Sequence, residues 1–210
     1  MPDSSIRNAY DQWASQYDND ANATRDLNAA VLRKQEFLRT DDDVLELGCG
    51  TGLNTEWLAE EAGAVVATDF SGGMLAKART QLSGTEASLR QMDVTEPWAF
   101  DDARFDCVVA TLVLEHVKHL EFVFREAHRV LRPGGTLYLC ELHPYRQLDG
   151  TQANFDHAES GETVTIDAFM HPVSEFVNEG VDAGFSVRRM GEWYGPTDDA
   201  PRLLSILFGA

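Results

Sequence analysis

Three glycines at alternate positions follow a short apolar run, and this spacing suits a loop that holds a ligand. The run covers 44–47, and the glycines are Gly48, Gly50 and Gly52. Because glycine has no Cβ, such a loop can turn sharply and let a ligand approach the backbone. A helical pattern begins at Leu53, so the sequence predicts a strand, a tight loop and a helix start. A cofactor with a nucleoside group is the expected occupant.

The spacing of these glycines argues against two phosphate-binding loops. The dinucleotide fingerprint G-x-G-x-x-G needs a third glycine at the position that Leu53 occupies. A Walker-type loop needs a lysine after its last glycine, and none follows Gly52. A nucleotide-cofactor oxidoreductase therefore remains an alternative that Leu53 disfavours.

Three acids lie at or near the ends of predicted strands. Asp69 ends the run 64–68 and suits the two hydroxyls of a ribose; the alternative is the N-cap of the following helix. Asp93 follows the predicted strand 87–92, where a turn-forming role is the alternative. Glu46 interrupts an apolar strand, which is costly unless its carboxylate is hydrogen bonded. We expect loop amides to satisfy it.

Further candidates follow the fourth and fifth predicted strands, whose carboxyl ends border the ligand crevice of an open α/β sheet. Thr111 to His116 come after the strand 105–110, and His116 suits a general base or a structural helix start. His143, Tyr145 and Arg146 come after the strand 136–142. Arg146 suits an acceptor carboxylate or a solvated surface. No compact set of metal ligands is apparent, so we expect no metal.

Alternating helical and extended patterns must position these residues. Such alternation predicts a parallel sheet covered by helices on both faces. The last two predicted strands, 185–192 and 203–208, are separated by a short link, which suits antiparallel neighbours. We therefore expect an α/β fold: a Rossmann-like, seven-stranded, mostly parallel sheet with one antiparallel strand.

Composition limits the partners of the chain. Its 210 residues predict a single domain, and 35 acidic against 17 basic side chains give a formal charge of -18. This charge repels nucleic acid and anionic membranes, and it suits adaptation to high salt. We find no apolar run of roughly 18 residues and no signal-like start. The expectation is a cytoplasmic protein with neither nucleic-acid nor membrane partners.

The order of these motifs resembles the class I S-adenosylmethionine (SAM)-dependent methyltransferases, in particular the small-molecule type found in ubiquinone and menaquinone biosynthesis. The motifs are Glu46-x-Gly48-x-Gly50-x-Gly52, Asp69, Asp93, Leu114-Glu-His116 and Leu131-Arg-Pro-Gly-Gly135. The resemblance implies SAM as cofactor, S-adenosylhomocysteine as its product and a small-molecule acceptor. It assigns the ribose to Asp69, and the adenine to Asp93 and the amide of Val94.

The resemblance also implies the remaining contacts. The cofactor-binding set is Tyr17, Glu46, Gly48, Cys49, Gly50, Gly52, Asp69, Phe70, Met74, Asp93, Val94 and Thr111, and the catalytic candidates are His116, His143, Tyr145 and Arg146. We expect a helical lid at 1–42, a SAM-binding core at 43–142, a substrate-covering insert at 143–172 and a C-terminal helix and hairpin at 173–210. The chain is expected to be a monomer or homodimer. A SAM-sensing or scaffold protein without turnover is the alternative to an enzyme.

Overall fold

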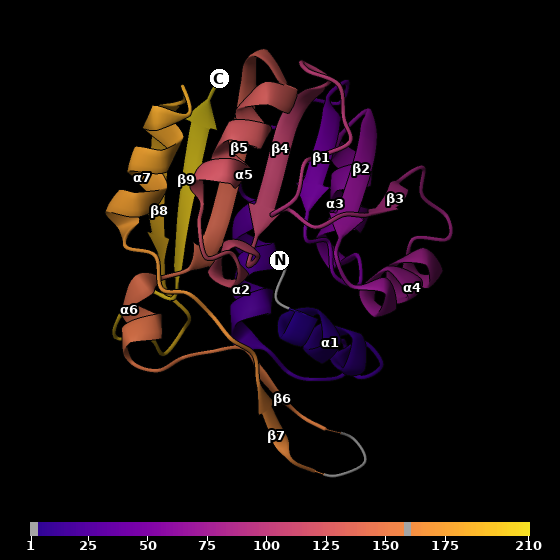
Figure 1. The fold of residues 1–210 in the computed structure, drawn as a ribbon, viewed down its shortest axis with the longest axis vertical. Helices are drawn as coiled ribbons and strands as arrows, with labels where there is room; N and C mark the ends of the chain where they lie inside the picture. The colour runs from indigo at the N-terminus through magenta and orange to yellow at the C-terminus, as the bar shows by residue number, and fades with distance from the viewer. Residues whose placement is uncertain (1–3, 158–160) are drawn as a thin grey trace.

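A twisted sheet of seven strands organises the chain, whose residues 4–157 and 161–210 are described by a computed structural model (Figure 1). The strand order is β3-β2-β1-β4-β5-β9-β8. The strands are β1 (Asp43–Leu47), β2 (Ala64–Asp69), β3 (Ser88–Gln91), β4 (Phe105–Thr111), β5 (Leu131–Leu142), β8 (Ser186–Trp193) and β9 (Leu203–Gly209). Strands β1 to β5 pair in parallel, and β9 runs antiparallel to both of its neighbours. The predicted fold is confirmed.

The strand order reverses between β1 and β4. From β1 the chain proceeds through β2 to β3 on one side, and then returns to β4 and β5 on the other. In open α/β sheets, ligands bind at the carboxyl ends of the strands beside such a reversal. The glycine loop follows β1 and therefore lies at this point.

Helices cover both faces because strand side chains alternate between them. One hydrophobic core joins the sheet to α5 (Glu121–Val130) and α7 (Val173–Asp182). A second joins the opposite face to α2 (Ala23–Leu32), α3 (Leu53–Glu61) and α4 (Gly72–Gln81). A third, smaller cluster holds α1 (Ser4–Trp13) against the hairpin of β6 (Asn154–Asp156) and β7 (Thr163–Thr165). This hairpin projects from the body of the molecule (Figure 1).

Two local expectations are corrected. The sequence pattern predicts Thr24 as the cap of the second helix, but the Asn22 side chain accepts hydrogen bonds from the backbone N–H groups of Thr24 and Arg25. Asparagine is a stronger N-cap than threonine, which explains the shift. The segment 143–172 reads as irregular, yet it also contains α6 (Pro144–Leu148) besides the hairpin; its residues 158–160 lie outside the described ranges.

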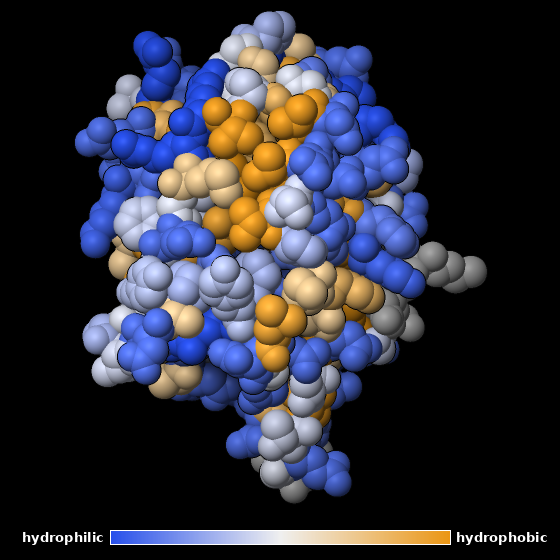
Figure 2. Space-filling model, turned by 90° about the vertical axis from the view of Figure 1, so that its left-hand side faces the viewer, coloured by the Kyte–Doolittle hydropathy of each residue, from blue (hydrophilic) through white to orange (hydrophobic). Residues whose placement is uncertain are grey.

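The face of the molecule on the side where α7 and β8 lie is mostly hydrophilic, and apolar areas interrupt it (Figure 2). Exposed apolar residues of these two elements are Val181, Val187 and Met190. Val187 and Met190 belong to β8, the edge strand of the sheet, and Val181 belongs to α7. Within the described ranges we find no helix long and apolar enough to cross a membrane.

Candidate functional site

The loop after β1 adopts a conformation that favours glycine. Gly48, Gly50 and Gly52 have φ angles of +67°, +56° and +98°. A Cβ on Gly48 would lie 2.1 Å from Cγ2 of Val113, so the backbone can approach that side chain only without one. A Cβ on Gly50 would meet no described atom within 4 Å, so this residue faces open space. The loop is therefore tightly packed on one side and open on the other.

Asp69, at the end of β2, fixes this loop. Its Oδ2 accepts a hydrogen bond of 2.9 Å from the Gly50 N–H, and its Oδ1 accepts one of 2.8 Å from the Ser71 N–H. Burial raises the pKa of Asp69 to about 6, although the amide hydrogen bonds oppose the shift. Ser71, not Asp69, caps α4 through a hydrogen bond from the Met74 N–H. Each Asp69 oxygen retains acceptor capacity for a ligand.

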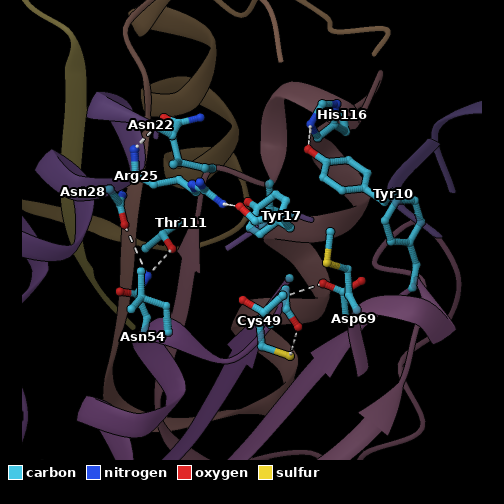
Figure 3. A pocket seen from close by; sticks show the side chains of 18 of the residues that line it. Tyr10, Tyr17, Asn22, Arg25, Asn28, Cys49, Asn54, Asp69, Thr111 and His116 are labelled. Carbon is cyan, nitrogen blue, oxygen red and sulfur yellow. Dashed lines mark hydrogen bonds between the residues drawn. The ribbon is translucent and has the colours of Figure 1, made fainter. Parts of the chain in front are cut away.

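A cavity of about 490 Å³ opens beside this carboxylate (Figure 3). Its volume falls within the range of small-molecule sites. Eleven of the residues proposed from the sequence line it: Tyr17, Gly48, Cys49, Gly50, Asp69, Phe70, Met74, Asp93, Val94, Thr111 and His116. The fold therefore brings together residues from the loop after β1, the end of β2, α4, the segment after β3, the end of β4, the segment after β4 and the N-terminal segment.

Asp93 lines the cavity and also forms a turn. Its Oδ1 accepts hydrogen bonds from the N–H and hydroxyl of Thr95, at 3.0 and 2.6 Å. Its Oδ2 accepts a hydrogen bond of 3.0 Å from Arg7 of α1. Asp93 can therefore form the turn and still face a ligand, because the turn holds its carboxylate at the cavity wall.

Glu46 and Gly52 are predicted site residues that are not among those lining the cavity. The Thr55 hydroxyl, one turn into α3, donates to Oε2 of Glu46 at 2.6 Å, so a side chain and not the loop amides makes this hydrogen bond. Burial raises the pKa of Glu46 to about 7. A Cβ on Gly52 would lie 3.0 Å from Cδ1 of Leu82. Glu46 and Gly52 are therefore packed against protein atoms of α3 and Leu82.

The sequence analysis missed a polar cluster at the opposite end of the cavity. Nδ2 of Asn54 donates to Asn28 Oδ1 at 3.3 Å and to Thr111 Oγ1 at 3.2 Å (Figure 3). Oδ1 of Asn54 is buried and has no hydrogen-bond partner among the described residues. Arg25 is the one arginine or lysine among the described residues that line the cavity. Its guanidinium lies 4.1 Å from the Tyr17 ring centroid and donates to the Tyr17 carbonyl.

The N-terminal segment closes the cavity through side chains that the sequence analysis also missed. The Thr51 hydroxyl of the glycine loop donates to Asp18 at 2.6 Å. The Ser71 hydroxyl donates to Asp11 of α1 at 2.6 Å. The Tyr10 hydroxyl lies 2.7 Å from Nε2 of His116. These contacts join residues far apart in sequence, so local patterns give no signal for them.

Three of the four catalytic candidates are not among the described residues lining the cavity. His143 is fully buried, accepts the Tyr145 N–H as the N-cap of α6, and lies 3.1 Å from Glu192. Arg146 forms an ion pair with Asp198. These contacts tie α6 to Glu192 of β8 and to Asp198, which follows β8, so contact of these residues with an acceptor stays a prediction.

Tyr145 is the most exposed of the three, at 56%. His116, in the short helix η1 (Leu114–His116), is the remaining catalytic candidate at the cavity. Within the part of the chain that the structure describes, no three His, Cys, Asp or Glu side chains are arranged to hold a metal ion.

Comparisons with known proteins agree with this geometry. A family model described as "Methyltransferase domain" matches residues 45–139. An uncharacterized methyltransferase of Emericella nidulans is 29% identical over 85% of this chain and 75% of its own length. The demethylmenaquinone methyltransferase of Clavibacter sepedonicus is 30% identical over 71% of this chain, which spans 62% of that relative's length.

A solved structure has the same fold. The SAM-dependent methyltransferase from Mesorhizobium loti superimposes with a TM-score of 0.72 at 23% identity, covering 91% of this chain and 99% of that one. The matched family model spans β1 to β5, where the glycine loop and Asp69 lie. Residues 45–139 therefore match the methyltransferase domain family, and most of the chain has the fold of a solved SAM-dependent methyltransferase.

Proposed function

We propose that this chain transfers the methyl group of SAM to a small-molecule acceptor in the cavity beside the glycine loop. The observation that carries the proposal is the position of Asp69, whose buried carboxylate is held by two loop amides at the cavity wall. A carboxylate at the end of the second strand suits the paired hydroxyls of a ribose. Bound SAM supplies a methyl group on a positively charged sulfur.

We propose contacts for the rest of the cofactor from the residues around Asp69. The Asp93 carboxylate suits the adenine amino group, with Phe70 and Met74 beside the ring. The methionine end would lie toward the polar cluster at Asn54. Oδ1 of Asn54 is buried without a partner among the described residues, so it could accept a hydrogen bond from the ammonium group. Arg25 suits the methionine carboxylate at the same end.

A small acceptor is favoured over a macromolecule. The cavity is covered by the N-terminal segment, which contacts the glycine loop and η1 through Asp18 and Tyr10. Its lining includes Asp18, Asp20, Asp26, Asp69 and Asp93. Such a lining repels polyanions, in agreement with the formal charge of -18. The protein would align the acceptor and exclude water.

The proposal is tested by methyl labelling. The purified protein is incubated with SAM carrying a trideuterated methyl group and a metabolite extract, and labelled products are identified by mass spectrometry. We expect a labelled small molecule and an equal amount of S-adenosylhomocysteine, both reduced in the Asp69→Asn variant. If calorimetry shows saturation with SAM but no S-adenosylhomocysteine forms above the enzyme-free control, the chain binds without turnover and the proposal is wrong.

A further inference from the structure

A chain of hydrogen bonds crosses the cavity wall from α1 to the insert after β5. The Tyr10 hydroxyl lies 2.7 Å from Nε2 of His116 (Figure 3). On the other side of the ring, Nδ1 of His116 lies 2.9 Å from the carbonyl oxygen of Asp167. Three elements separated in sequence therefore meet at one imidazole.

This arrangement determines which nitrogen of His116 carries the proton. A carbonyl oxygen can only accept a hydrogen bond, so Nδ1 must donate to Asp167. The neutral ring then has an unprotonated Nε2, and the Tyr10 hydroxyl donates to it. Asp167 is thus a positioning residue that acts through its backbone. Nε2 is the basic atom, and Tyr10 covers it.

Acidic and phenolic groups surround this pair. Oε1 of Glu115, also in η1, lies 3.9 Å from Nε2 of His116. Burial raises the pKa of Tyr10 well above its usual range, and the nearby Tyr17, Glu115, Asp69 and Glu141 raise it further. Tyr10 therefore stays a phenol and does not accumulate as a phenolate. Tyr10 can donate its proton to His116 only if it accepts a proton from another group at the same time.

We propose that Tyr10 and His116 form a proton relay for an acceptor that carries a hydroxyl group. Both side chains line the cavity, and an acceptor can reach the basic Nε2 through the Tyr10 oxygen. Tyr10 is the catalytic residue that touches the acceptor, and His116 is the base behind it. This inference rests on the proposed function and names the acceptor class.

The relay balances atoms and charge. The acceptor O–H bond breaks and its proton moves to the Tyr10 oxygen, while the Tyr10 proton moves to Nε2 of His116. The acceptor oxygen forms a bond to the methyl carbon as the sulfur–methyl bond breaks, and that electron pair remains on sulfur. The positive charge of the sulfonium is thereby replaced by the charge of the imidazolium, which later releases its proton to water.

The lining narrows the acceptor further. Ile6, Val113, Val117 and Tyr17 present apolar or aromatic surface in the same cavity. Arg25, the one arginine or lysine among the described residues that line the cavity, is assigned to the methionine carboxylate of SAM, and Arg146 is paired with Asp198 outside the cavity. The acceptor is therefore expected to be an uncharged alcohol, phenol or enol with an apolar face, and not a carboxylate or phosphate.

The test compares Tyr10→Phe and His116→Asn with the controls Tyr194→Phe and His119→Asn, which change exposed residues outside the cavity. S-adenosylhomocysteine release is followed from pH 6 to 10 with the metabolite extract as acceptor source. General-base loss typically lowers the rate by about 10²- to 10⁴-fold. We expect this deficit at neutral pH in both variants, no deficit in the controls, and recovery as pH rises and the acceptor ionises unaided. Circular dichroism and SAM affinity should stay unchanged.

Nitrogen-15 NMR of the wild-type protein provides a readout independent of turnover. We expect His116 protonated at Nδ1 and unprotonated at Nε2. A His116 ring protonated at Nε2 instead of Nδ1 would overturn the relay. A product methylated at nitrogen or sulfur would overturn it too, as would a rate deficit in Tyr10→Phe and His116→Asn that does not change with pH. If the wild-type protein turns over and the Tyr10→Phe variant does so at the same rate, the relay is wrong but the proposed function stands. Absence of all turnover contradicts both the relay and the proposed function.

Discussion

Asp69 combines two roles at the residue scale. Its oxygens hold the N–H groups of Gly50 and Ser71, and the same oxygens face the proposed ribose site. The carboxylate must be ionised to accept from all of these donors. Its pKa of about 6 in the unliganded protein therefore links cofactor affinity to pH.

We predict that the dissociation constant for SAM rises as pH falls below about 6, because protonation of Asp69 removes an acceptor from the ribose. Asp69→Asn should weaken binding by roughly 1.5 to 3 kcal/mol, which is about 10- to 150-fold, and should abolish this pH dependence. Calorimetry between pH 5 and 8 measures both effects. Asp101→Asn, which alters an exposed carboxylate outside this cavity, is the control. Equal affinity of Asp69→Asn and wild type would place the ribose elsewhere.

The glycine loop offers a matched pair of substitutions. Gly48→Ala forces a Cβ against Val113 at a positive φ angle, so we expect a loss of roughly 2 to 5 kcal/mol in the free energy of unfolding. Gly50→Ala has the strain of a positive φ but no clash, so a loss of about 1 kcal/mol is expected. Its methyl group should instead obstruct the cavity and weaken SAM binding.

Urea unfolding and calorimetry separate the two effects. A Gly48→Ala protein as stable as wild type would contradict the close packing of the loop against Val113. A Gly50→Ala protein with unchanged SAM affinity would show that the cofactor does not approach this backbone.

At the scale of elements, α1 and the β6–β7 hairpin form a unit with a core of its own. Trp13 stacks on Phe155 with ring centroids 5.1 Å apart, and Ile6 and Ile166 belong to the same cluster. This cluster is separate from the two cores that hold the sheet. We propose that this unit is the lid of the cavity and that it opens independently of the sheet.

Phe155→Ala should therefore loosen the lid selectively. Removing a buried aromatic side chain costs about 3 to 5 kcal/mol in the unit that it stabilises. We expect faster amide exchange in α1 and weaker SAM binding, with unchanged protection of β1, β4 and β5, measured by hydrogen–deuterium exchange. The control Phe185→Ala removes an equally buried ring from the main core and should expose the strands. If amide exchange in Phe155→Ala became faster by the same factor in the sheet as in α1, the lid would not open independently.

The elements around the cavity were predictable because their signals are local. An apolar strand, three glycines and Asp69 at the end of the next strand are read within a few residues, and parallel strands bring their carboxyl ends together. The same reasoning placed Asp93 and His116 at the cavity. It also gave the reversed direction of β9 from a link too short for a parallel crossover.

The candidates beyond β5 could not be placed in this way. His143 and Arg146 follow a strand end like the others, but their partners Glu192 and Asp198 lie far away in sequence and hold them outside the cavity. The pairing of Tyr10 with His116 joins residues 106 positions apart. Such contacts depend on how the peripheral segments pack, and no periodicity encodes that packing.

At the scale of the whole molecule, the charge of -18 opposes folding through self-repulsion. The acids of α7 and α5 are an example: burial raises the pKa of Glu179, and the nearby Glu121, Asp182 and Glu175 raise it further. Salt shortens the range of this repulsion from about 10 Å at 0.1 M to about 3 Å at 1 M. The melting temperature should therefore rise with sodium or potassium chloride.

A charge variant checks that prediction. Glu179→Gln should raise the melting temperature at 0.1 M salt, because it removes a half-buried negative charge that lies near other acidic side chains. The increase in melting temperature should be smaller at 1 M salt. Glu86→Gln, which changes an exposed residue with no other acidic residue within four positions of it in the sequence, is the control. A melting temperature that falls with added chloride would contradict a role for self-repulsion.

The central claim is that the cavity beside the glycine loop holds SAM by its ribose, and a crystal structure with S-adenosylhomocysteine tests it most directly. We predict both ribose hydroxyls within hydrogen-bonding distance of the Asp69 carboxylate, the adenine amino group at Asp93 and the backbone of Gly50 beside the methionine part of the ligand. A ligand bound elsewhere, or one whose ribose faces away from Asp69, would contradict the account.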